Sequence, residues 1–222
     1  MKRHFILSGA FAFLFVLLIA FVKLLDVAVI GPLGTAVGLS SLNGAFHALT
    51  GVLPLWDRLT DAVLLLAILA VGVFALIGVK QLFKRRSLKK VDAELLFLGG
   101  VLVLLAAFYL FFEIFIINYR PVTEDGMLAA SFPSSHAMLS VTVFLSVAII
   151  LKRYVPRHAL CLSLQVLCVA LAAFSVLGRL LSGVHWLTDV LGSVLISLAI
   201  VFLYKGILVL FKSKRGAPVK KQ

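Results

Sequence analysis

An arginine, a histidine and an aspartate lie close together near the C-terminal end of a chain that is otherwise strongly apolar. His185 follows Arg179 by six residues, and Asp189 follows the histidine by four. Because four residues make about one helical turn, His185 and Asp189 are expected to share a helix face, where the carboxylate can orient the imidazole. Arg179 offers a guanidinium fork that suits an anion. This segment therefore predicts a phosphate site.

A second polar group, Ser134, Ser135 and His136, stands at the start of another apolar run. Serine just before a helix can cap it, and the free N–H groups of the first helical turn bind anions with the help of the helix dipole. His136 is then placed to give a proton to a departing oxygen. Arg120, followed by Pro121, which stiffens the loop, adds a second guanidinium.

These groups suit phosphoryl transfer, in which catalysis consists mostly of positioning and of neutralising charge on the phosphoryl oxygens. We expect His185, with Asp189 at its other nitrogen, to attack phosphorus in line and form a phosphohistidine. His136 would protonate the departing oxygen, and water would hydrolyse the intermediate. The phosphoryl oxygens would be held by Arg120, Arg179 and Ser134.

We expect no metal ion and no other cofactor in this reaction. A metal site needs clustered carboxylates or several histidine and cysteine ligands. Among the acidic residues, only Asp189 is close to a histidine of the predicted site.

The elements that must position these residues are expected to be membrane helices. The 222 residues are 63% hydrophobic, with a mean hydropathy of +1.17, which is more apolar surface than a soluble core can bury. A formal charge of +12 would suit a nucleic-acid binder, but the basic residues fall in short clusters between apolar runs, as the positive-inside rule describes. We therefore expect one integral membrane domain over residues 1–222, with the lipid bilayer and not nucleic acid as its partner.

Six apolar runs are long enough to cross a bilayer, so the expected fold is all-α and polytopic. The Gly-rich segment between the first two runs is expected to hold a short interfacial helix near 43–49, on which Asn43 and His47 are read as solvated. The predicted spans are 5–25, 60–79, 95–117, 136–151, 159–177 and 186–211.

The basic clusters predict the orientation of the six spans. If both chain ends are cytoplasmic, the clusters at 80–90 and 152–157 and the basic tail at about 212–222 all lie on the cytoplasmic side with Lys2 and Arg3. Both groups of catalytic residues then lie at the extracytoplasmic ends of their helices. We expect a bacterial inner membrane, with the active site facing the extracytoplasmic side.

Three motifs resemble the signature of the phosphatidic acid phosphatase type 2 superfamily, whose pattern is Lys-x6-Arg-Pro, Pro-Ser-Gly-His and Ser-Arg-x5-His-x3-Asp. The resemblance covers roughly residues 113–189. It implies a six-helix fold and metal-independent hydrolysis of lipid phosphates or diphosphates, with the roles assigned above. The matching residues are Arg120 and Pro121, then Pro133, Ser134 and His136, then Arg179, His185 and Asp189.

The chain departs from this pattern at three positions. Ser135 replaces a glycine, Gly178 replaces a serine, and Glu113 stands where the superfamily has a lysine. An acid at 113 removes a phosphate-binding cation and adds repulsion. Glu113 could pair with an arginine of the site, be a neutral buried acid, or mark an altered choice of substrate.

The leading hypothesis is a lipid phosphatase that acts on an isoprenoid diphosphate such as undecaprenyl diphosphate, or on phosphatidic acid or phosphatidylglycerophosphate. A phosphotransferase with a lipid acceptor would use the same phosphohistidine. A lipid-phosphate binding or transport protein without turnover is the third reading, and it depends on Glu113. Taken alone, His185 and Asp189 could also be a polar pair at a helix end.

Overall fold

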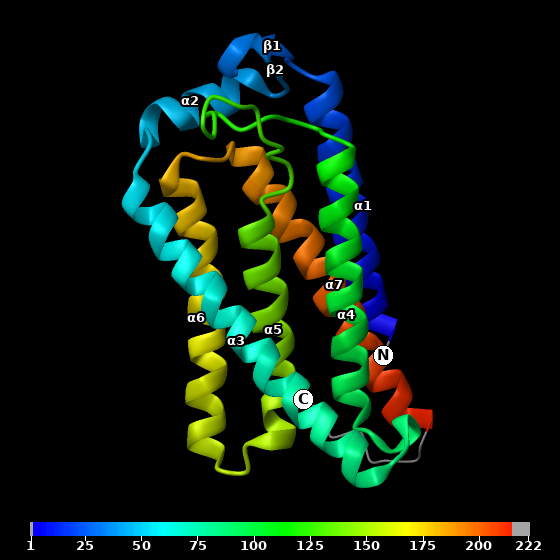
Figure 1. Ribbon diagram of the computed structural model, residues 1–222. Coiled ribbons are helices and arrows are strands. Elements are labelled where there is room, and N and C mark those ends of the chain that lie inside the picture. Colours follow the sequence, from blue (N-terminus) through cyan, green and yellow to red (C-terminus); the bar gives the residue numbers. More distant parts are fainter. Residues whose placement is uncertain (1, 215–222) are drawn as a thin grey trace.

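The computed structural model describes residues 2–214, most of which lie in six long helices that run between the two ends of a bundle (Figure 1). All six are long and apolar enough to cross a membrane, which confirms the six expected spans. The part of the predicted basic tail after Lys214 lies outside the described residues. The long helices are α1 (Lys2–Leu24), α3 (Pro54–Arg85), α4 (Ala93–Ile114), α5 (Ser135–Tyr154), α6 (His158–Ser182) and α7 (Leu187–Lys214).

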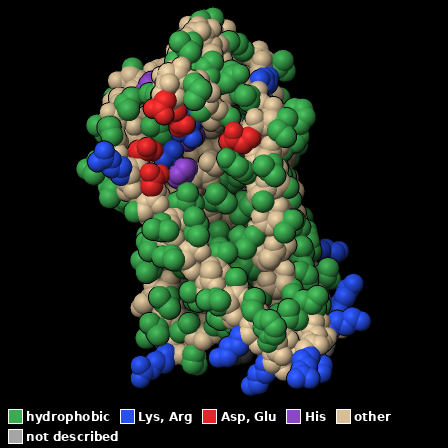
Figure 2. Space-filling view, in the orientation of Figure 1, with side chains coloured by type: hydrophobic (Ala, Val, Ile, Leu, Met, Phe, Trp, Pro, Cys, Tyr) green, Lys and Arg blue, Asp and Glu red, His purple; other side chains and the backbone are tan. Residues whose placement is uncertain are grey.

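Helices α5 and α7 form the centre of the bundle. Of their most apolar segments, 61% and 44% of the residues are buried, more than in any other long helix. Helix α5 packs against α3, α6 and α7, and α1 covers the other side of α7. The faces of α1, α3, α4 and α6 that point outward carry exposed leucine, valine and phenylalanine side chains, seen as the apolar surface in Figure 2. Lipid is the solvent that suits such a surface.

Serine hydroxyls join the two central helices. Ser193 Oγ donates to the carbonyl of Ser134 at 2.8 Å, and Ser197 Oγ donates to the carbonyl of Met138 at 3.1 Å. Small side chains let membrane helices approach closely, and such hydrogen bonds are favourable where no water competes. The start of α5, where Ser134 lies, is therefore fixed to α7.

Helix α3 is longer than its apolar run predicts. It begins at Pro54 instead of residue 60 and continues to Arg85. Proline is well suited to the first turn of a helix, and Asp57 in the first turns interacts favourably with the helix dipole. The predicted start at residue 60 was therefore too late, and Asp57 and Asp61 both lie on this helix.

A small cap lies between α1 and α3 at one end of the bundle (Figure 1). It contains a hairpin of two short strands, which the sequence did not predict, and the expected short helix. Its elements are β1 (Ala28–Val29), η1 (Pro32–Gly34), β2 (Ala36–Val37) and α2 (Ser40–Thr50). Outside the cap, a short 3-10 turn, η2 (Leu88–Lys90), joins α3 to α4.

Asn43 fixes this cap to the bundle. Its side chain is completely buried, so the prediction that it is solvated was wrong. Asn43 Nδ2 donates to Thr188 Oγ1 at 3.0 Å, and the N–H of Thr188 donates to Asn43 Oδ1 at 3.1 Å. The second bond satisfies one of the N–H groups that the first turn of α7 leaves without a helical partner.

Charged side chains are divided between the two ends of the bundle. Figure 2 shows lysine and arginine along the lower end, while acidic side chains surround a basic patch and a histidine in the upper half. The lower end holds the cluster at 80–90, the cluster at 152–157 and the C-terminal end of α7. The predicted catalytic residues therefore lie at the end of the bundle opposite to the basic clusters.

Candidate active site

His185 lies in the turn between α6 and α7, and only 3% of it is exposed. Its Nδ1 lies 3.1 Å from Ser131 Oγ and 3.8 Å from Asp189 Oδ2. Its Nε2 is buried and has no hydrogen-bond partner among residues 2–214. An imidazole that is held at one nitrogen and free at the other is arranged as a nucleophile.

Ser131 stands between the histidine and the aspartate. Its hydroxyl donates to Asp189 Oδ2 and lies within hydrogen-bonding distance of His185 Nδ1. The expected orientation of His185 by Asp189 is therefore relayed through a serine. The sequence analysis missed Ser131, because a serine in a polar loop carries no signal that distinguishes it from its neighbours.

The expectation that His185 and Asp189 share a helix face was wrong, because α7 begins at Leu187, after the histidine. Asp189 Oδ2 accepts the N–H of Trp186 at 2.9 Å, so the carboxylate caps the helix in the manner of a capping box. Gly183 makes the turn before it, with φ at +70° and no room for a side chain, since a Cβ there would lie 2.0 Å from the carbonyl oxygen of Gly51.

Burial lowers the pKa of His185 well below its ordinary value, and the charges of Arg179, Arg120 and His136 lower it further. The neutral form of the ring is the one that can attack phosphorus. The lowered pKa therefore favours the nucleophilic form of His185 at neutral pH.

A small, narrow pocket opens beside His185, which is one of its lining residues. Its polar lining includes Arg120, Ser135 and Glu113, and its apolar lining comes mainly from α4 and the loop before α5. The structure thus brings together residues from three distant parts of the sequence. The apolar lining residues include Phe108, Phe112, Phe132, Pro133 and Met138.

Several buried polar atoms near this pocket have no hydrogen-bond partner in the described part of the chain. They belong to residues that the sequence analysis assigned to nucleophilic attack, phosphate binding or proton transfer, and Ser134 among them donates its N–H to the carbonyl of Asp189 at 3.2 Å. Unsatisfied buried polar groups are costly, and phosphoryl oxygens would satisfy the donors among them, while Nε2 of His185 keeps its lone pair for attack on phosphorus. The atoms are Ser134 Oγ, His136 Nδ1, Arg179 Nε and His185 Nε2.

The first turns of α3 hold Arg179 and His136. Arg179 Nη1 donates to the carboxylate of Asp57 and, at 3.2 Å, to Thr60 Oγ1. Asp61 Oδ1 lies 3.0 Å from His136 Nε2 and 4.0 Å from Arg179 Nη1. The sequence analysis missed both acids. The predicted span at 60–79 left Asp57 outside the helix, so the spacing of four residues that places Asp57 and Asp61 on one helix face was not used.

Arg120 is held by the loop that leads to α5. The loop pairs with itself, so that the N–H of Arg120 donates to the carbonyl of Ala129 at 3.0 Å and its guanidinium pairs with the carboxylate of Glu124. Trp186 Nε1 donates to the carbonyl of Tyr119 at 2.7 Å, which ties this loop to the turn that carries His185. Arg120 therefore has a defined position in the pocket lining.

Gly178 allows α6 to approach α3 closely. A Cβ at this position would lie 2.5 Å from Cγ2 of Thr60, whose hydroxyl bonds Arg179. The methyl group of Thr60 thus occupies the space that a serine side chain at position 178 would need, and serine is the residue of the superfamily pattern at this position.

We expect Gly178→Ser to destabilise the protein by about 1–3 kcal/mol, because the added atoms overpack the contact between α6 and α3. Thermal unfolding in detergent would measure this loss. Gly72→Ser is the matched control, since a Cβ at Gly72 meets no atom within 4 Å. Equal stability of the two variants would contradict the prediction.

Comparison with known proteins agrees with this geometry. The model of the PAP2 superfamily matches residues 95–211, which is more than half of the chain. The chain belongs to the PAP2 superfamily. The matched part of this PAP2 protein contains all the predicted site residues, from Glu113 to Asp189. The resemblance found in the sequence is therefore confirmed, and the chain is a membrane phosphatase.

The PAP2 fold is also found in a similar solved structure, that of the first transmembrane PAP2 type phosphatidylglycerolphosphate phosphatase from Bacillus subtilis. The TM-score is 0.62 at 22% sequence identity, and the match covers 94% of this chain and 96% of that chain. The likeness therefore extends over the whole six-helix bundle. No curated protein matches the sequence.

Proposed function

We propose that this protein hydrolyses a lipid phosphate or diphosphate through a phosphohistidine formed on His185. The observation that carries the proposal is the buried Nε2 of His185, which has no partner in the described residues and adjoins a pocket that Arg120 also lines. A nucleophile and a phosphate-binding cation in one pocket are the two parts that phosphoryl transfer needs.

The proposed reaction has two steps. His185 Nε2 forms a bond to the terminal phosphorus while the bond from that phosphorus to the leaving oxygen breaks, and His136 gives the leaving oxygen a proton. The leaving oxygen is the ester oxygen of a lipid phosphate or the bridging oxygen of a lipid diphosphate. Water then attacks the phosphohistidine, with His136 accepting a proton from it, and inorganic phosphate leaves as Nε2 is freed. The guanidiniums of Arg120 and Arg179 neutralise charge on the phosphoryl oxygens throughout.

The pocket lining supports a lipid substrate. Aromatic side chains of α4 line the pocket next to His185, together with Phe132 and Pro133, which precede α5 and are joined by a cis peptide bond. Hydrocarbon can lie against these side chains while the phosphate reaches the histidine. We propose isoprenoid diphosphates such as undecaprenyl diphosphate, phosphatidic acid and phosphatidylglycerophosphate as candidates. The similar Bacillus subtilis structure is that of a phosphatidylglycerolphosphate phosphatase, which supports including the last of these.

Phosphate release from these lipids by the purified protein in detergent tests the proposal. We expect release from at least one of them, and we expect the rate to survive an excess of a metal chelator, since histidines and arginines perform every proposed step. A protein that releases phosphate from none of the panel, or that needs an added divalent ion, would contradict the proposal.

We further propose that the active site faces the extracytoplasmic side of a bacterial cell membrane. The division of charge between the two ends of the bundle supports this orientation, because positive clusters remain in the cytoplasm.

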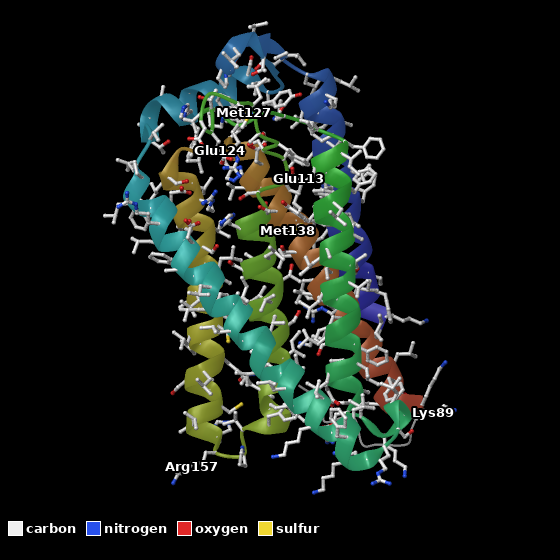
Figure 3. The ribbon with its side chains drawn as sticks, in the orientation of Figure 1. Lys89, Glu113, Glu124, Met127, Met138 and Arg157 are labelled. Atoms are coloured by element: carbon white, nitrogen blue, oxygen red, sulfur yellow. The ribbon has the colours of Figure 1, made fainter. Side chains whose placement is uncertain are left out.

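Cysteine labelling of intact cells tests the orientation. Met127→Cys, in the loop at the active-site end, should react with a membrane-impermeant maleimide, and Lys89→Cys, at the basic end, should react only after lysis. Figure 3 shows the two residues at opposite ends, and both are exposed. The natural Cys161 and Cys168 are buried free thiols, so the unsubstituted protein serves as the blank. The reverse labelling pattern would invert the proposed topology.

A further inference from the structure

Glu113 is an acid in the lining of the phosphate pocket. It is the second-last residue of α4, it is exposed, and it lines the same pocket as His185 and Arg120. Figure 3 shows it near the upper end of α4, at the same end of the bundle as Glu124. The carboxylate has no ion pair or hydrogen bond to any side chain of residues 2–214.

Three other acids near the site have partners. Asp57 pairs with Arg179 and Glu124 with Arg120, while Asp61 Oδ1 lies 3.0 Å from His136 Nε2. Among the described residues that line the pocket, Glu113 is the one acid, and its carboxylate has no such partner.

An unmatched carboxylate beside a phosphate is unfavourable, because the two anions repel each other. The phosphate position is fixed independently by His185, whose Nε2 is buried and unpartnered in the part of the chain that the structure describes. A cation between the phosphate and Glu113 would turn this repulsion into attraction on both sides.

The substrate itself can carry that cation. The pocket lining near Glu113 is apolar, with Phe108, Phe112 and Met138 from α4 and α5. With the phosphate at His185 and hydrocarbon against these side chains, the substrate atoms nearest Glu113 are those that link the phosphate to its hydrocarbon chain. A protonated amine on this link would donate a charge-assisted hydrogen bond to the carboxylate.

We propose that the preferred substrate is a lipid phosphate monoester with a protonated amine close to the phosphate, and that Glu113 binds this amine. The inference rests on the proposed function, since it takes His185 as the atom to which phosphate is transferred. It makes Glu113 a specificity-determining residue that contacts substrate and leaves the two steps of the reaction unchanged.

Two single-chain probes that differ only at the amine test the inference. Sphingosine 1-phosphate carries a protonated amine on the carbon next to the phosphate-bearing carbon, and its N-acetyl derivative has the same chain without the charge. In mixed detergent micelles with chelator, kcat/KM of the wild type should favour the amine by about tenfold, the size of one charge-assisted hydrogen bond. Glu113→Gln should bring the ratio close to one, and Glu113→Lys should reverse it.

Asp125→Asn is the matched control, because Asp125 is an exposed acid of the neighbouring loop that lies outside the pocket lining. It should keep the wild-type ratio. Equal hydrolysis of the two probes by the wild type, or a preference that survives Glu113→Gln, would overturn the inference. So would a preference that appears only when a divalent ion is added, because the cation would then be a metal ion.

The two proposals can fail separately. If phosphate is released from other lipid phosphates but not faster from the amine probe, the amine inference is wrong and the phosphatase proposal stands. If phosphate is released from no lipid phosphate at all, both proposals are wrong.

Discussion

His185→Asn should abolish phosphate release, with kcat lowered on the order of 10⁶-fold, as expected when a catalytic nucleophile is removed. Asparagine can place a polar atom close to the position of Nδ1, so the contact with Ser131 is kept while the attacking Nε2 is lost. The variant therefore separates the chemical role of the ring from its structural role. Initial rates with the best lipid of the panel, and thermal unfolding of the same sample, would measure both.

A trapping experiment makes this prediction sharper. Rapid acid-free quenching of the wild type with a radiolabelled lipid phosphate should leave label on the protein in an acid-labile, base-stable form, the behaviour of a phosphohistidine. His185→Asn should carry none. His158→Asn, at the exposed start of α6, is the control and should be labelled like the wild type. Full turnover in His185→Asn would disprove the assignment of the nucleophile.

Asp189→Asn should lower kcat on the order of 10³- to 10⁴-fold, the range expected when a buried aspartate behind a catalytic histidine loses its charge. As Nε2 bonds to phosphorus, the ring becomes positive, and the carboxylate stabilises that charge through Ser131. Asparagine keeps an oxygen that can accept the N–H of Trp186, so α7 should still begin at the same place. Measured kcat should fall while the unfolding temperature changes little.

A double-mutant cycle tests whether the serine is the relay. Ser131→Ala alone should lower kcat, and Ser131→Ala combined with Asp189→Asn should be little worse than Asp189→Asn alone, because both changes break the same chain of hydrogen bonds. Fully additive losses would show that Ser131 and Asp189 act independently.

The sequence was sufficient to predict the membrane helices, because the bilayer imposes a simple requirement on them. A helix must stay apolar for about 20 residues to cross the bilayer, and no loop can substitute for it. The ends of the helices were less predictable. The apolar run of α3 stops short of its true start, since Pro54 and Asp57 favour a helical first turn without being strongly apolar.

The residues of the candidate site also divide into those that the sequence predicts and those that it does not. His185, Asp189 and Arg179 could be proposed from the sequence because charged residues are rare in membrane helices and the spacing of these three is regular. Ser131 was missed and Asn43 was read as solvated, because their contacts exist only after distant segments meet. A serine that bridges to a histidine 54 residues away, and an asparagine that bonds a threonine 145 residues away, leave no local pattern.

The ion pairs at the site reduce its ability to attract a phosphate from a distance. Arg179 faces Asp57 and Arg120 faces Glu124, so each guanidinium is neutralised by a neighbour before any phosphate binds. The site then projects little field into solution, where salt already screens charge beyond about 8 Å. A soluble enzyme would lose its means of steering an anion from bulk water. A lipid is already confined to the plane of the membrane, where two-dimensional diffusion brings it to the helices, and attraction is needed only over the last few ångströms.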